Sequence, residues 1–134
     1  EYIPDLNQRL DFYRRIQIAS DRNQCMELSR EISDRFGPHP EPVDKLLILL
    51  EIRVLCQRLH ISQAKMKNGE VILTLLPSTS LSTEDLTAIL DGRLKMLSEF
   101  QIGILMERKG WQADLKMICE CLQKISRSLT LKQV

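Results

Sequence analysis

Four cysteines are the side chains best suited to metal binding or redox chemistry, and their spacing argues against both. They are Cys25, Cys56, Cys119 and Cys121, and no two of them have the C-x₂-C spacing of zinc and thioredoxin-like sites. The first three lie on or beside apolar helical stripes, which favours buried, reduced thiols over disulfides or metal ligands. Because reduced thiols are typical of the cytosol, we expect a cytoplasmic protein without a metal site.

The two histidines, His39 and His60, are the other side chains suited to acid–base chemistry. His39 lies in a proline-rich turn, and His60 lies at the end of an apolar helical stretch. Nothing in the sequence brings a cysteine or a carboxylate to either histidine. The chain has no G-x-x-x-x-G-K-[ST] loop, G-x-G-x-x-G fingerprint, G-x-S-x-G elbow or H-E-x-x-H pair. We therefore expect an exposed loop histidine, a helix-end histidine, and no enzyme: the chain has no predicted catalytic residue and no cofactor.

Two short basic groups suggest DNA binding as one function: Lys65 with Lys67, and Arg108 with Lys109. Phosphate binding needs several cations on one surface with few anions between them, and a glutamate stands close to each group. The formal net charge is +1, and the chain has only three Phe, two Tyr and one Trp. Neither a strong basic field nor an aromatic platform for bases is expected, and direct DNA binding stays open as an alternative.

A third charged group consists of Glu31, Asp34 and Arg35, at the end of a helical stretch. Because residues three and four apart are neighbours on a helix, Glu31 lies beside both of the others. One interpretation is an intrahelical ion pair of Glu31 with Arg35, worth about 0.2–0.5 kcal/mol. The other is a charged contact patch that faces another domain, which makes these three residues the candidate partner interface.

The residues that follow this charged group end the helix. Gly37 takes positive φ without a Cβ penalty, and Pro38, Pro40 and Pro42 cannot continue the helix. We expect the helix to end at Phe36 or Gly37. Pro42 suits the first position of the next helix, where its missing N–H is not needed.

Helical periodicity predicts three helices before residue 60. The first spans about residues 6–19 and places these side chains on one face, with Phe12, Ile16 and Ala19 beside it: Leu6, Leu10, Tyr13 and Gln17. The second begins with a capping box of Asp21 and Gln24 and buries a stripe of Cys25, Leu28, Ile32 and Phe36. The third is apolar nearly all round, as expected of a helix on which others pack.

The second half of the chain alternates strand and helix signals. Asn68-Gly69 favours a type I′ turn between strands 61–67 and 70–76. Ser82 is the predicted N-cap of a short helix that uses Leu86, Ile89 and Leu90 and stops at Gly92. Two further strands, 94–97 and 100–107, precede a last helix; in the second strand one side alternates Phe100, Ile102, Ile104 and Met106.

The last helix carries a regular apolar stripe made of Trp111, Leu115, Ile118, Leu122, Ile125 and Leu129. One interpretation is an amphipathic helix that covers the core. The alternative is a homodimerisation module, although the stripe is short for an independent coiled coil. We expect the residues after about Ser126 to fray.

The length and composition of the chain predict a single α+β domain. The 134 residues are enough to bury a core. We expect residues 1–134 to form one domain with helices over about 5–60, then a hairpin, a short helix, a second ribbon and a C-terminal helix over about 61–129, the helices packing with a small, mostly antiparallel sheet. No membrane-spanning segment or leader is recognised, and the start at Glu1 suggests a piece of a larger protein.

The chain combines several segments that rarely occur together: Tyr2-Ile3-Pro4-Asp5, Arg9, Tyr13-Arg14-Arg15, Asp34-Arg35-Phe36-Gly37-Pro38 and the apolar helix after them. This combination resembles the C-terminal domain of bacterial transcription-repair coupling factors. The resemblance is specific over residues 2–60 and afterwards depends more on the order of elements. It implies a parent protein with a UvrB-like module, an RNA-polymerase-binding domain and two RecA-like motor domains that use ATP and magnesium to translocate on double-stranded DNA.

The resemblance also implies a regulatory role for this domain. In the family the domain packs on the UvrB-like module of the same protein and masks the surface that recruits UvrA, as an autoinhibitory clamp. The family's contact carries a Glu-x-x-Asp-Arg pattern before Phe-Gly, which falls here on Glu31, Asp34 and Arg35. The implied direct partner is the UvrB-like module; UvrA, RNA polymerase and DNA are partners through the parent, no membrane is involved, and the domain is a monomer.

Overall fold

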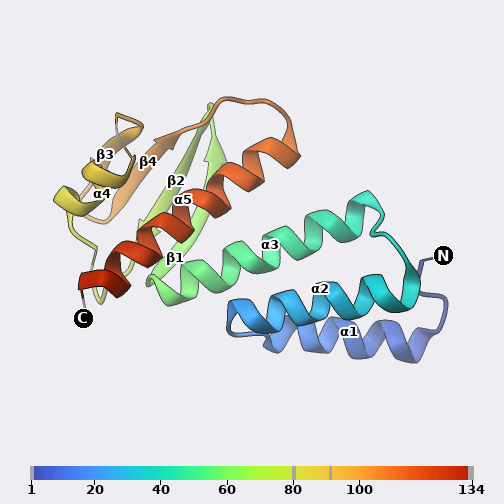
Figure 1. The fold of residues 1–134 in the computed structure, drawn as a ribbon. Helices are drawn as coiled ribbons and strands as arrows, with labels where there is room; N and C mark the ends of the chain where they lie inside the picture. Colours follow the sequence, from blue (N-terminus) through green and yellow to red (C-terminus); the bar gives the residue numbers. More distant parts are fainter. Residues whose placement is uncertain (1, 80, 91, 133–134) are drawn as a thin grey trace. The chain divides into compact units, whose positions relative to one another are not determined.

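The computed structural model describes residues 2–79, 81–90 and 92–132 (Figure 1). The helices and strands follow one another as α1 (Leu6–Ile18), α2 (Arg22–Phe36), α3 (Glu41–Arg58), β1 (Ile61–Lys67), β2 (Glu70–Leu75), α4 (Thr83–Leu90), β3 (Leu94–Ser98), β4 (Gln101–Leu105) and α5 (Trp111–Lys132). The chain divides into two compact units, Glu1–Val54 and Leu55–Val134. Their boundary lies within α3, and the change from helices to strands follows at the end of that helix. The α+β fold class is confirmed.

Local hydrogen bonds set the helix ends of the first unit. The Asp21 side chain accepts from the backbone N of Gln24 at 2.8 Å, and the Gln24 side chain accepts from the backbone N of Ser20 at 2.7 Å. The capping box is therefore present, with its return bond shifted back by one residue. At the other end of α2, Gly37 has φ 88° and its N–H donates to the Ser33 carbonyl at 2.9 Å.

The next helix begins slightly earlier than predicted. Glu41 is its first residue and Pro42 its second. The carbonyl of Pro40 accepts from the backbone N of both Val43 and Asp44 at 3.0 Å, which makes Pro40 the cap. The prediction that Pro42 is the first helical residue was therefore wrong by one position, because the N–H that Pro42 lacks is dispensable throughout the first turn.

The core of the first unit contains one side of each helix. Its buried residues are Phe12, Ala19, Cys25, Leu28, Ile32, Leu50 and Val54. Leu6, Leu10 and Tyr13 are more than half exposed, so the inward face of α1 is the one centred on Phe12. The sequence emphasised the neighbouring stripe because both stripes are apolar at helical spacing, and periodicity alone does not distinguish them.

Arg53 of α3 explains why the apolar run of that helix is interrupted. Its Nη2 donates to the carbonyls of Ile16 and Ala19, at 2.8 and 3.1 Å, at the end of α1. A cation there satisfies carbonyls that lack helical partners and complements the negative end of the helix dipole. Arg53 therefore fastens α1 to α3 within the first unit.

The second unit is built around a four-stranded antiparallel sheet of order β1-β2-β4-β3 (Figure 1). The β1–β2 turn has positive φ at both Asn68 (51°) and Gly69 (80°), which confirms the predicted type I′ hairpin. Ser82 caps α4, since its hydroxyl accepts from the backbone N of Asp85 at 3.2 Å. The sheet prediction is confirmed, and the strand order is new.

The core of the second unit combines alternate strand residues with α4 and α5. Ile102, Ile104 and Met106 are buried as predicted, and Phe100 is 37% exposed. From α5, Ile118, Leu122 and Ile125 are buried, and the helix runs to Lys132. The sequence assigns Ile89 and Leu129 to apolar faces, but their side chains are not among those that the structure describes. Because these three α5 residues are buried in a single copy, they are not exposed to a second one.

Candidate functional site

Glu31, the first residue of the predicted interface, lies between two arginines. Its Oε2 accepts from Nη2 of Arg15 at 2.5 Å, and its Oε1 is 3.6 Å from Nη1 of Arg35. The predicted intrahelical contact of Glu31 with Arg35 is therefore present. The shorter contact comes from α1 and was not predicted, because Arg15 and Glu31 are far apart in sequence and no local spacing relates them.

Two aromatic rings lie beneath these arginines. The guanidinium carbon of Arg15 is 5.2 Å from the centre of the Phe12 ring, and that of Arg35 is 5.7 Å from the same ring. Arg35 is also 5.5 Å from the centre of the Phe36 ring, whose edge packs against Phe12 at 6.0 Å. Cation–π attraction favours such positions. We call the five side chains Phe12, Arg15, Glu31, Arg35 and Phe36 the arginine cluster.

Electrostatics keeps the central pair of the arginine cluster charged. The hydrogen bond from Arg15 lowers the pKa of Glu31 below its usual value; burial opposes this, and the positive charges of Arg15 and Arg35 add to the lowering. The same hydrogen bond raises the pKa of Arg15. The carboxylate of Glu31 is therefore committed to contacts within the first unit at neutral pH.

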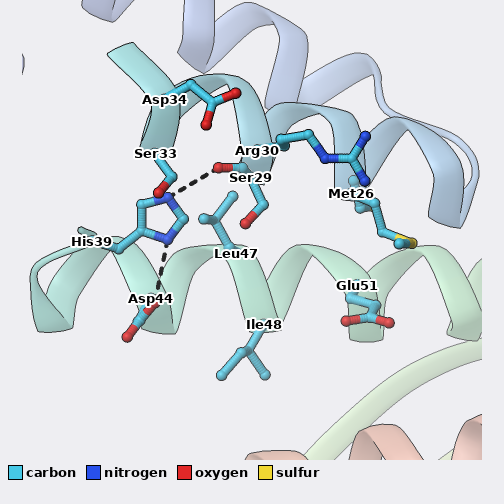
Figure 2. A pocket seen from close by; sticks show the side chains of 11 residues that line it. Met26, Ser29, Arg30, Ser33, Asp34, His39, Asp44, Leu47, Ile48 and Glu51 are labelled. Atoms are coloured by element: carbon cyan, nitrogen blue, oxygen red, sulfur yellow. Dashed lines mark hydrogen bonds and ion pairs between the residues drawn. The ribbon is translucent and has the colours of Figure 1, made fainter. Parts of the chain in front are cut away.

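Asp34 differs from its two neighbours in the predicted interface. It is exposed, and within the described part of the chain no hydrogen bond or ion pair to its side chain is found. It stands at the rim of a groove of about 480 Å³ between α2 and α3, which Arg30 and Ser33 also line (Figure 2). Asp34 is thus the negative charge of the group that remains available to a partner.

His39 lies in the same groove and is not the exposed, unpartnered histidine that the sequence predicts. Its Nε2 is 3.1 Å from the Ser29 carbonyl, and its Nδ1 is 3.4 Å from Oδ1 of Asp44 (Figure 2). Its side chain is only 11% exposed. The prediction was wrong because the turn at Gly37 folds the chain back along α2 and brings the first turn of α3 to the ring. His60 follows α3 as expected, with its Nδ1 2.7 Å from the Ser78 hydroxyl.

Tyr2 connects the two segments that carry the family resemblance. Its hydroxyl donates to the carbonyl of Gly37 at 2.5 Å, and its ring packs against Phe36 at 5.9 Å and edge-on against His39 at 6.4 Å. The start of the chain is therefore tied to the turn that ends α2, next to the arginine cluster.

The basic groups considered for DNA binding are partly paired with acidic side chains. Lys109 pairs with Glu107 at 2.7 Å, and Arg93 lies 3.6 Å from the same carboxylate. Arg108 lies against the hairpin turn, where a Cβ on Gly69 would come within 2.6 Å of its Nε. Of the four cations, Lys109 is thus paired within the second unit and Arg108 lies beside the hairpin turn, while Lys65 and Lys67 are both exposed on β1.

The four cysteines are free thiols and buried, as predicted for Cys25, Cys56 and Cys119. Burial raises the pKa of Cys56 to about 11. Among the residues that the structure describes, no group of three or more His, Cys, Asp or Glu side chains is placed to hold a metal ion. No helix in these ranges is long and apolar enough to cross a membrane.

The comparisons with known proteins decide the family. The family model described as the TRCF domain matches residues 1–86, which is more than half of the chain. The chain belongs to the TRCF domain family. This confirms the resemblance seen in the sequence, and the match covers the whole arginine cluster and Asp34.

The curated relatives of this TRCF domain are far longer proteins. The transcription-repair-coupling factor of Escherichia coli K12 is 43% identical over 61 residues, which cover 46% of this chain and 5% of that protein. That of Bacillus subtilis 168 is 30% identical over 119 residues, covering 86% and 10%, and that of Buchnera aphidicola is 28% identical over 127 residues, covering 92% and 16%. The chain therefore spans a small part of the length of these relatives.

A solved structure has the same fold as this TRCF domain. The crystal structure of the C-terminal domain of transcription-repair coupling factor superposes with a TM-score of 0.76 at 21% identity, covering 95% of this chain and 86% of that one. At this identity the likeness shows the fold. The family pattern singles out Glu31, Asp34 and Arg35 as candidates, and the contacts of Arg15, Phe12 and Tyr2 near them are visible only in the folded structure.

Proposed function

We propose that this TRCF domain is the regulatory C-terminal domain of a transcription-coupled DNA repair translocase. In this proposal it packs on the UvrB-like module of the same protein through the patch of Glu31, Asp34 and Arg35, of which Asp34 and Arg35 are the side chains that remain accessible, and masks the surface that recruits UvrA. The names of the relatives support the repair context. The observation that carries the proposal is the exposed carboxylate of Asp34, which has no partner among the residues that the structure describes, next to an arginine placed against two aromatic rings.

The charges of the first unit suit a reversible clamp. Asp34 is exposed and the Arg35 side chain is 44% exposed, so both remain accessible to solvent in this structure. Charge pairs at the rim of an interface give specificity and fast association more than affinity, and salt weakens them. A contact of this kind opens without a large free-energy cost.

Tethering compensates for the modest strength of such a contact. A partner on the same chain is present at an effective concentration in the millimolar range for a short flexible linker. A conformational change elsewhere in the protein then needs only a few kcal/mol of differential contact to release the clamp. We assign that change to the motor domains as they engage stalled RNA polymerase.

The chemistry of the parent belongs to other parts of the protein in this proposal. RecA-like motor domains hydrolyse ATP with magnesium and move on double-stranded DNA, and this domain contributes the inhibitory contact alone. The proposal places the protein in the cytoplasm, where the DNA and the repair machinery are. It also expects the isolated domain to be a monomer, which light scattering tests directly against the homodimer alternative.

The test of the proposal is UvrA recruitment by the full-length protein with Asp34→Arg. We expect this variant to capture UvrA without DNA or polymerase, whereas the unsubstituted protein does not. The matched control is Glu99→Arg, which reverses an exposed acidic residue at the β3–β4 turn in the second unit. Equal and low UvrA capture by all three proteins, with unchanged thermal unfolding, would reject the masking role.

A further inference from the structure

The three residues of the predicted interface differ in whether their charged groups already have partners within the first unit. Both oxygens of Glu31 face arginines of the arginine cluster. Asp34 has no partner within the described residues, and Arg35 is held by one 3.6 Å ion pair and two rings. The geometry therefore separates a residue that orders the patch from two that face outward.

We propose that Arg15 is a positioning residue for this contact: it holds the Glu31 carboxylate in place, and Glu31 in turn orients the Arg35 guanidinium that meets the partner. This inference rests on the proposed function, because it assigns a role within the same interface. It adds a residue that lies on α1, outside the Glu-x-x-Asp-Arg pattern.

Arg15 is suited to this role by two contacts that a lysine cannot make together. Its planar guanidinium lies over the Phe12 ring at 5.2 Å and donates to Glu31 at 2.5 Å. A lysine supplies a point charge and does not stack in this way. Phe12 is 2% exposed and belongs to the core of the first unit, so packing fixes the ring over which Arg15 lies, while the Arg15 side chain itself is 35% exposed.

Arg15 orients Arg35 through one carboxylate, that of Glu31. With Arg15 present, Oε2 of Glu31 is engaged and Oε1 is left facing Arg35. Without Arg15, the carboxylate is free to rotate, and Arg35 loses the fixed acceptor that selects its rotamer. A side chain ordered before binding loses less conformational entropy on docking. Arg15 thus supports affinity without itself touching the partner.

Arg14 offers a matched control. It is the next residue on the same helix, carries the same charge, is 74% exposed, and its one described ion pair is with Asp11 at 3.9 Å. Arg14→Gln and Arg15→Gln therefore change the net charge equally, and they differ in the contact with Glu31.

The experiment measures calorimetric binding of the 134-residue chain to the separately produced UvrB-like module. We expect Arg15→Gln to weaken affinity about five- to tenfold, because it removes the contact that holds Glu31. Arg14→Gln should weaken affinity less than about twofold, because it removes only an exposed charge. A double-mutant cycle supplies the decisive readout: in an Arg35→Gln background, Arg15→Gln should change affinity less than about twofold, because its effect runs through Arg35.

A second readout follows Arg35 in the unbound domain. The NMR signal of the Arg35 Nε–H should shift on Arg15→Gln and stay in place on Arg14→Gln. An unmoved signal, or an equal loss of affinity from Arg15→Gln in both backgrounds, would overturn the positioning role while leaving the clamp intact. Absence of binding by the unsubstituted domain would instead contradict the proposed function, and the inference with it.

Discussion

The Arg15 guanidinium donates to the Glu31 carboxylate at 2.5 Å, joining α1 to α2 directly above the buried ring of Phe12. This contact is shorter than the 3.6 Å contact of Glu31 with Arg35 on its own helix. Glu31 therefore holds side chains in place within the first unit, while Asp34 and Arg35 remain accessible. The following predictions test parts of this arrangement.

The Arg15–Glu31 pair should make stability depend on pH. Because the folded protein lowers the pKa of Glu31, the pair stabilises the fold above the unfolded value of about 4.3 and loses this contribution as the pH falls through the lower folded value. Glu31→Gln should cost about 0.5–1 kcal/mol at neutral pH, as for a partly exposed pair, and nothing once the carboxylate is protonated. Denaturant titrations from neutral to acidic pH measure this, and Glu27→Gln, exposed one turn earlier, is the control.

Removing the Tyr2 hydroxyl should destabilise the turn that ends α2. Tyr2→Phe keeps the ring contact with Phe36 and deletes the hydrogen bond to the Gly37 carbonyl. The expected loss in the free energy of unfolding is about 0.5–1.5 kcal/mol. Tyr13→Phe is the control, since Tyr13 is 54% exposed. Equal stability of the two variants would show that the Tyr2 hydroxyl contributes nothing.

Gly37 should tolerate no other residue without a cost in backbone strain. Its φ of 88° and ψ of −172° lie in a region that is essentially restricted to glycine. A Cβ there meets no atom within 4 Å, so Gly37→Ala should cost about 1–3 kcal/mol from strain alone. Gly37→Asn should be equally costly, because asparagine is favoured in the left-handed helical region and not at this ψ. A fully stable Asn variant would contradict the observed conformation.

The four thiols should be unreactive in the native protein. All are buried, and burial raises the pKa of Cys25 and Cys121 as well as that of Cys56, which reaches about 11. Labelling with an alkylating reagent at mildly alkaline pH should therefore be slow for the folded chain and fast in denaturant. Rapid labelling of Cys56 in the native chain would show that its surroundings open easily.

The parts of the fold that sequence predicts well are those fixed by local chemistry. The Asn68-Gly69 turn, the Asp21 cap and the Gly37 stop each depend on the conformational range or hydrogen bonding of a few adjacent residues. Local chemistry does not determine which face of α1 is buried, because the helix has two apolar stripes. Packing against α2 and α3 decides which stripe faces inward. Only the packed helices decide that Phe12 is buried and Leu10 is exposed.

The site shows the same division between local and tertiary information. The family pattern and helical spacing were enough to single out Glu31, Asp34 and Arg35. The partners of His39 and the role of Arg15 depend on how the chain returns past Gly37 and how α1 pairs with α2. No spacing within the sequence predicts either contact. The position of Arg15 next to Ile16 is compatible with an exposed side chain as well as with a packed one.

The measurement that tests the central claim most directly is the affinity of this TRCF domain for the UvrB-like module of its parent, with and without Asp34→Arg. Calorimetry at about 50 and 200 mM salt separates a charge-dominated contact from an apolar one, because screening shortens from roughly 14 to 7 Å over that range. We predict binding that weakens with salt and is lost on the reversal. A variant that unfolds normally and binds the module as tightly as the unsubstituted domain would contradict the account.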